Sequence, residues 1–148
     1  MQSIIKDPTD ALNYIYGGKG KFTIVSKKTD TRFTYRVSRG KKRENSLLEP
    51  LMFVSVLNGP DNQSNYKYIG YIDQEHIGLQ AGRKGQPTLD SYIALNWVIN
   101  QVAVQEMPPQ LEVWHSGKCG ACGRELTVPE SIATGLGPVC AKRVYDAY

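Results

Sequence analysis

The sequence has no long apolar run. No stretch of about 18 consecutive apolar residues occurs among its 148 residues, so we expect no membrane-spanning helix and no membrane partner. The first ten residues, MQSIIKDPTD, have neither the basic start nor the apolar stretch of a secretory signal. The composition, with 41% apolar and 22% charged residues, is that of a globular protein that can bury a core. These features predict a cytoplasmic location.

The sequence motifs of common enzyme classes are also missing. There is no His-Glu-x-x-His, no Gly-x-Ser-x-Gly and no glycine loop with P-loop spacing; the glycine-rich segment 17–20 is too short. A zinc-dependent deaminase would need a His-x-Glu beside its cysteines, and none is present. We therefore expect no catalytic residues and a protein that is not an enzyme.

Cysteine is scarce and unevenly placed. The chain has three cysteines, all between positions 119 and 140, and only two histidines. A secreted disulfide scaffold usually has an even number of cysteines that are spread along the chain. A tight cysteine group with a histidine nearby instead indicates a metal site.

The spacing of this group favours zinc. His115 precedes Cys119 by four residues, Cys122 follows Cys119 by three, and Cys140 comes 18 residues later. Glycine follows both Cys119 and Cys122, which lets the backbone turn tightly enough for both thiolates to reach one ion. We predict that His115, Cys119, Cys122 and Cys140 bind one structural Zn²⁺ per chain, because four protein ligands leave no position for a reactive water.

Two alternatives to this site remain. In the first alternative, His115 is an ordinary surface histidine, and His76 or an external group completes the coordination shell. In the second alternative, Cys119 and Cys122 form a redox pair, although the sequence around them lacks the βαβ pattern of thioredoxin-like proteins.

Acidic residues are nearly absent from residues 19–43. This segment contains ten lysines and arginines against one acid, Asp30, whereas the rest of the chain has an excess of five acidic charges. Such a separation of charge indicates a polyanionic partner. The candidate nucleic-acid contacts lie on a predicted hairpin and the loop after it: Lys27, Lys28, Arg32, Arg36, Arg39, Lys41, Lys42 and Arg43.

The apolar patterns predict an α+β fold. Asp7 and Pro8 begin a helix that the glycines at 17 and 18 end, and a second helix is expected over 90–105 with Asp90 as its cap. Strands are expected over 21–27, 31–37, 51–57 and 66–72, with a weaker fifth at 76–79. The second strand alternates strictly, which places Phe33 and Tyr35 on a core face and Arg32 and Arg36 on the other.

The order of these elements predicts the domain organisation. An antiparallel sheet of four or five strands with two helices forms a body over 1–106. Residues 107–112, which include two consecutive prolines, form a linker, and 113–148 form a zinc-knuckle module. Within this module a helical turn is expected at 129–131 and a terminal helix at 138–145.

The stretch VWHSGKCGACGRELTVPESIATGLGPVC carries a recurring pattern of cysteines, glycines and one Pro-Glu-Ser-Ile. It resembles a zinc-knuckle family of unknown function found in proteins of tailed bacteriophages and prophages. The stretches FTIVSKKTDTRFTYRV and FVSVLNGPDNQSNYKYIG resemble the N-terminal parts of such phage proteins. The resemblance implies a metal site, a phage origin and the cytoplasm of a host cell, but no activity.

Together these features predict a phage-type accessory protein that binds nucleic acid through its basic hairpin and loop. Lysine and arginine contact phosphate whatever the base, so affinity without sequence specificity is expected. One alternative is an inhibitor or adaptor that binds a host protein, such as a defence or transcription component. Another is a binder that sequesters a small nucleotide signal.

Overall fold

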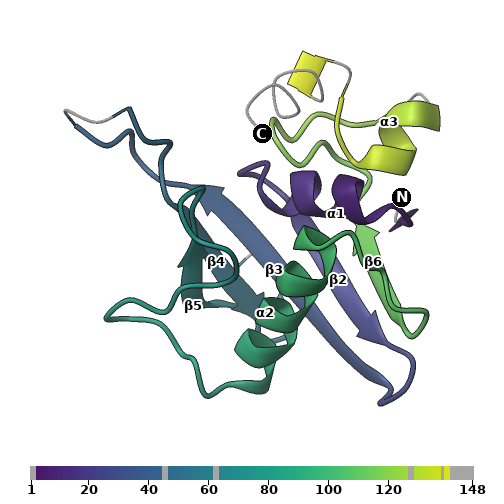
Figure 1. The fold of residues 1–148 in the computed structure, drawn as a ribbon, viewed down its shortest axis with the longest axis horizontal. Coiled ribbons are helices and arrows are strands. Elements are labelled where there is room, and N and C mark those ends of the chain that lie inside the picture. The colour runs from purple at the N-terminus through teal and green to yellow at the C-terminus, as the bar shows by residue number, and fades with distance from the viewer. Residues whose placement is uncertain (1–2, 45–46, 62–63, 127–128, 138, 141–148) are drawn as a thin grey trace.

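The computed structural model describes residues 3–44, 47–61, 64–126, 129–137, 139 and 140. It confirms the α+β class, with six antiparallel strands rather than four or five (Figure 1). In chain order the elements are β1 (Ser3–Ile5), α1 (Pro8–Ile15), β2 (Lys21–Ser26), β3 (Thr31–Arg39), β4 (Met52–Leu57), β5 (Tyr66–Ile72), α2 (Asp90–Ala103), β6 (Leu111–His115) and α3 (Pro129–Thr134). None of the helices described is long and apolar enough to cross a membrane.

The ends of the helices follow local chemistry. Asp7 caps α1 as predicted, because its carboxylate accepts the backbone N–H groups of Thr9 and Asp10 at 2.8 and 3.1 Å. Asp90, by contrast, is the first residue of α2 and not its cap; the capping position is Leu89, which makes no side-chain hydrogen bond. The helix ends at Ala103, two residues before the predicted end.

The four strands β2 to β5 were predicted from the sequence. β2 and β3 form the predicted hairpin, and β4 and β5 a second one with a bulge between Val54 and Ser55. The sheet order is β1-β6-β2-β3-β4-β5. A weak strand near 76–79 is not formed; instead Gln80 makes an isolated bridge to Tyr71.

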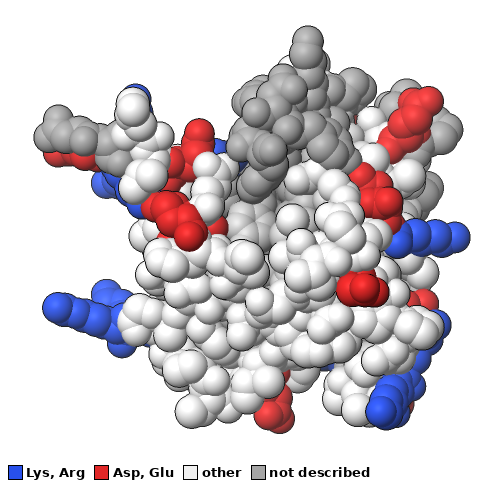
Figure 2. All heavy atoms as spheres, in the orientation of Figure 1, with Lys and Arg blue, Asp and Glu red and all other residues white. Residues whose placement is uncertain are grey.

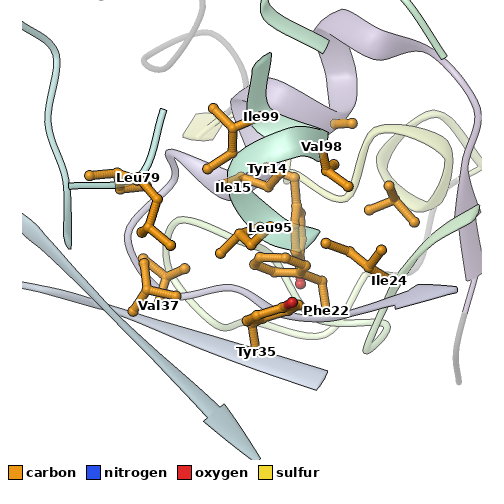
Figure 3. Packing of buried hydrophobic residues seen from close by; sticks show 14 of the residues in the cluster. Tyr14, Ile15, Phe22, Ile24, Tyr35, Val37, Leu79, Leu95, Val98 and Ile99 are labelled. Carbon is orange, nitrogen blue, oxygen red and sulfur yellow. The ribbon is translucent and has the colours of Figure 1, made fainter. Parts of the chain in front are cut away.

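The two faces of the sheet differ. One face packs against α1 and α2 and buries the main apolar core, in which Phe22 stacks on Tyr35 and Leu95 lies fully buried (Figure 3). The Tyr35 hydroxyl donates to the Ser91 carbonyl at 2.6 Å and so ties this face to α2. The side chains of the opposite face are mostly half-buried, since burial alternates along β4 and β6. We call this second surface the helix-free face.

Two strands were missing from the prediction. β6 lies in the sheet between β1 and β2 and pairs antiparallel with both, with Val113 opposite Ile5 and Ile24. It begins inside the predicted linker, 107–112, and continues into the predicted module, 113–148. The predicted boundary at 113 thus falls inside a strand of the sheet. The C-terminal module, defined here as the described residues from 116 onward, extends directly from β6.

The C-terminal module has a small core of its own. Cys119, Leu136 and Cys140 are buried together, with Ala121 and Leu126 packed against them. The helical turn predicted at 129–131 is confirmed as the start of α3. Of the predicted terminal helix, 138–145, only Val139 and Cys140 lie within the described residues, and both are helical.

Candidate metal centre and basic surface

The three cysteines converge at one point. The sulfur atoms of Cys119, Cys122 and Cys140 all lie within 4.8 Å of one another. Tetrahedral zinc–thiolate geometry places neighbouring sulfurs about 3.8 Å apart, so a small movement brings the three onto one ion. Cys119 and Cys140 are buried, whereas Cys122 is exposed.

A tight turn brings the first two cysteines together. The Gly123 N–H donates to the Cys119 carbonyl at 2.9 Å, and the Cys119 N–H donates to the Arg124 carbonyl at 2.8 Å. Gly123 has a φ of 81°, a left-handed conformation that glycine adopts without strain. This agrees with the expectation that glycine after Cys122 lets the chain fold around an ion.

The electrostatics around the sulfurs suit a cation. Burial alone would raise the pKa of Cys119, but the N–H groups of Gly137, Ala121 and Cys122 point at its sulfur and lower the pKa overall. Burial, together with hydrogen bonds to the Cys122 and Cys119 sulfurs, raises the pKa of Cys140 to about 12. Three adjacent thiols cannot all lose their protons unless a positive charge compensates them, and a metal ion would supply it. These residues can therefore hold a metal ion.

His115 is not part of this group. It faces the main core from β6, is 1% exposed and packs on the Tyr14 ring with centroids 5.6 Å apart. Its Nε2 lies 2.6 Å from the Ile132 carbonyl, and its Nδ1 accepts the Gly117 N–H at 2.9 Å. With both ring nitrogens engaged, the imidazole links β6 to α3. The spacing to Cys119 predicted a fourth ligand, but in the structure both ring nitrogens are engaged by Ile132 and Gly117.

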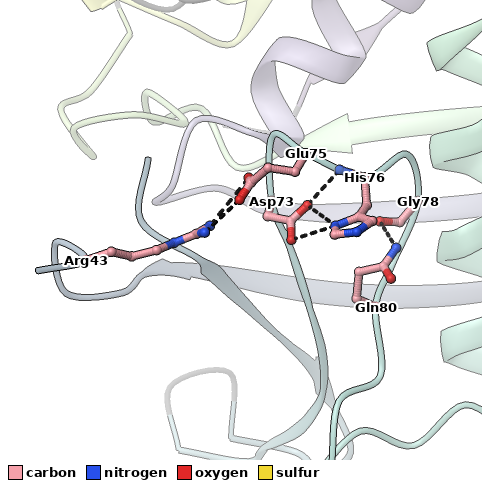
Figure 4. A network of polar contacts seen from close by, with 6 residues as sticks. All are labelled: Arg43, Asp73, Glu75, His76, Gly78 and Gln80. Atoms are coloured by element: carbon pink, nitrogen blue, oxygen red, sulfur yellow. Dashed lines mark hydrogen bonds and ion pairs between the residues drawn. The ribbon is translucent and has the colours of Figure 1, made fainter. Parts of the chain in front are cut away.

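His76, the alternative fourth ligand, is also engaged elsewhere. Its Nδ1 lies 3.1 Å from both carboxylate oxygens of Asp73, and its backbone N–H donates to the same carboxylate (Figure 4). In the described part of the chain, the group of metal-binding side chains consists of the three cysteines.

The eight predicted nucleic-acid contacts do not form one patch. Arg32 and Arg36 lie on the helix-free face, whereas Lys27 and Lys28 are exposed at the turn between β2 and β3. The helix-bearing face carries little charge at its centre (Figure 2).

Two of the predicted cations, at the end of β3 and in the loop after it, already have partners. Arg39 donates to the Gly17 carbonyl at 2.9 Å, and Arg43 forms an ion pair with Glu75 at 2.6 Å (Figure 4). Lys41 and Lys42 are exposed. Of the predicted set, Arg32 and Arg36 have the most suitable position for a ligand that lies across the sheet.

The structure brings together two cations and an aromatic ring from three strands. The Arg36 guanidinium lies 4.2 Å from the centroid of the Tyr66 ring, and the Lys21 ammonium lies 5.5 Å from it. Lys21 stands directly opposite Arg36 in the sheet. The sequence pattern predicts the two strands, but only their register shows that these two residues are paired. Tyr66 belongs to β5, which β3 and β4 separate from β2, the strand that carries Lys21.

Aromatic side chains lie on the same face. Phe53, 39% exposed, meets the edge of Tyr68 with centroids 6.1 Å apart, and half-buried Trp114 pairs with Thr23 across β2 and β6. Tyr35 is a core residue as expected and Phe33 packs against that core.

Comparison with known proteins gives one match. Residues 111–145 match DUF6011, a family of unknown function. The matched segment contains β6, the three cysteines and α3, and leaves the sheet from β1 to β5 outside it. No curated protein and no solved structure matches the chain.

Proposed function

We propose that this protein binds single-stranded nucleic acid on its helix-free face, while a structural zinc ion held by Cys119, Cys122 and Cys140 stabilises its C-terminal module. The observation that carries the proposal is the cluster of Lys21 and Arg36 around the Tyr66 ring on an open sheet. The resemblance to phage proteins suggests an accessory role in the cytoplasm of a host cell.

The chemistry of this face fits a single strand better than a duplex. Proteins that bind single strands combine cations that contact phosphates with aromatic rings on which bases stack. Arg32 and Arg36 supply the first, and Tyr66, Tyr68 and Trp114 supply the second. Bases in a duplex are already stacked, so flat rings on a sheet have little to bind there. Neither group reads a particular base, and the proposal predicts weak sequence preference.

The zinc ion has a structural role in this proposal because the core of the module is small. The ligand count no longer supports that role, since the three cysteines leave the fourth coordination position to an external group. Thiolates are preferred ligands of zinc, and the ion would hold together a module whose own core is small. No enzymatic step is proposed.

Fluorescence anisotropy tests the nucleic-acid proposal. Labelled DNA and RNA strands of about 15 nucleotides, a length that spans one compact binding site, would be titrated with protein at several salt concentrations. Tyr66→Ala should weaken binding about tenfold, in the range of one lost stacking contact. Arg36→Gln should weaken binding and reduce the salt slope by about one counterion.

Lys6→Gln is the matched control, since it removes one exposed positive charge outside the helix-free face. Binding that responds equally to Lys6→Gln and Arg36→Gln would reflect net charge alone and contradict the proposed site. A preference for duplex over single strand would contradict the stacking argument.

One observation favours the alternative of a protein partner. A hollow of about 360 Å³ lies between α2 and the β2–β3 hairpin, and its lining includes the exposed apolar residues Ile93 and Trp97. Capture from host lysate after nuclease treatment, with Trp97→Ala for comparison, tests this candidate. A partner that is retained by the native protein and lost with Trp97→Ala would support it.

A further inference from the structure

We infer that the groove between the sheet and the C-terminal module is a binding site for a phosphate group. The groove is about 460 Å³ and runs beside Cys122. This inference deepens the proposed function, and it rests on that function only for the identity of the molecule that carries the phosphate.

The lining of the groove is strongly cationic. Five basic side chains reach it from three separate parts of the chain: Lys19, Lys21, Arg36, Arg39 and Lys118. No aspartate or glutamate is among the lining residues in the part of the chain that the structure describes. Lys19, Lys21 and Lys118 were not among the predicted contacts. Lys118 lies almost 100 residues from the other two in sequence.

The walls of the groove are fixed before any ligand arrives. The Lys19 N–H donates to the Gly120 carbonyl at 2.7 Å and so joins the start of β2 to the module. Arg39 is held by the Gly17 carbonyl, and a Cβ at Gly18 would lie 2.9 Å from the Arg39 guanidinium. Because the backbone segments that carry these cations are tied together, little ordering is needed on binding.

Like charges face one another at the groove. Lys21 and Arg36 are direct cross-strand partners, an arrangement that is unfavourable for like charges. Burial lowers the pKa of Lys21, and the charges of Arg36 and Lys118 lower it further, while Asp61 acts in the opposite sense. A bound anion would relieve this repulsion. Phosphate suits the site because its several oxygens and up to two charges can meet several cations at once.

The test is a titration of the zinc-loaded protein with inorganic phosphate, in which the NMR chemical shifts of the backbone amides are measured. We expect saturable shifts for residues around the groove. Lys19→Gln together with Lys118→Gln should weaken phosphate binding at least about tenfold, as expected when two ionic contacts are lost. Both lysines are exposed, so the fold should persist, and the melting temperature verifies this.

Lys27→Gln with Lys28→Gln is the matched control, because it removes the same charge from the β2–β3 turn outside the groove. Equal weakening by the two double variants, or the absence of saturable shifts at the groove, would overturn the inference.

The source of the phosphate is tested by competition with an oligonucleotide that lacks terminal phosphates. Displacement of inorganic phosphate by this strand would assign the groove to a phosphodiester and support both proposals. Groove-dependent phosphate binding without any oligonucleotide binding would leave the site valid, with a small phosphate compound as its ligand, and would contradict the proposed function alone.

Discussion

The sheet body and the C-terminal module are stabilised in different ways. Among the described residues, the main core buries apolar side chains from all six strands and from α1 and α2. They include Phe22, Tyr35 and Leu95. The module buries one leucine and two cysteines. Burial of this size supplies only a few kcal/mol in the module, so we expect its order to depend on the body that it touches and on the proposed metal.

The contact between the two regions is unusually close. A Cβ at Gly17 would lie 2.6 Å from the Gly120 carbonyl oxygen, and one at Gly120 would lie 2.7 Å from the Tyr14 ring. A Cβ at Gly135 would lie still nearer this ring. Three glycines thus allow backbone to meet backbone and aromatic ring directly. The module depends on this contact, whereas the body has a core that extends well beyond it.

Removal of the metal is the largest expected effect and the sharpest test of this difference. Cys140→Ser, or a strong chelator, should lower the bound metal from one ion per chain to almost none. Small zinc domains gain about 10 kcal/mol from their metal, so the module should lose its amide protection while the sheet retains most of its own. Native mass spectrometry gives the stoichiometry, and hydrogen exchange resolved by region gives the protection. A module that keeps full protection in chelator would remove the distinction between the two regions.

The interface itself is tested by Gly120→Ala. The added methyl group collides with the Tyr14 ring, and the rearrangement should cost about 1–3 kcal/mol in the free energy of unfolding, measured with urea. Gly137→Ala is the control within the same module, since its Cβ meets nothing within 4 Å and its N–H to Cys119 is kept. Equal costs at both positions would show that the close contact is not what joins the regions.

The smallest expected effect is a loss of stability in acid through His115. Burial lowers the pKa of His115 below its ordinary value of 6.5, and its Nδ1 must stay unprotonated to accept the Gly117 N–H. The folded state therefore binds this proton less readily than the unfolded state. Its contribution is complete above pH 6.5 and decreases as the pH falls below that value, by at most about 1.4 kcal/mol per pH unit.

Urea unfolding between pH 7.5 and 5 measures this slope. His115→Gln should flatten it relative to the native protein, because glutamine can donate and accept without titrating. The comparison of slopes separates this effect from acid release of the metal, which the native protein and the variant would share.

Much of the fold was accessible from sequence because its signals are local. β2, β3, β4 and β5 pair with chain neighbours, and each has an apolar period of two with a turn beside it. β1 and β6 have three and five residues and pair across more than 100 positions, so no hairpin pattern marks them. The prolines at 108 and 109 suggested a linker where the chain only turns into β6.

In the candidate site, too, features that depend on local spacing were predicted, and features that depend on long-range pairing were not. The cysteines were predicted correctly as a group because their spacing alone carries the chemistry. The position of His115 depended on a strand that the sequence did not reveal, and its neighbours Ile132 and Gly117 satisfied its nitrogens instead. Likewise, total charge located Arg36 but not its partner Tyr66, since the sheet register joins them.

The place of β6 has a consequence for synthesis on the ribosome. β1 and β2 leave the exit tunnel early, but the strand that separates them is translated about 90 residues after β2 begins. Until then both present unpaired edges, which are open to incorrect pairing with other chains. Formation of the native sheet must wait for the long loop to close, and we expect the nascent chain to rely on hairpins and chaperones during that interval.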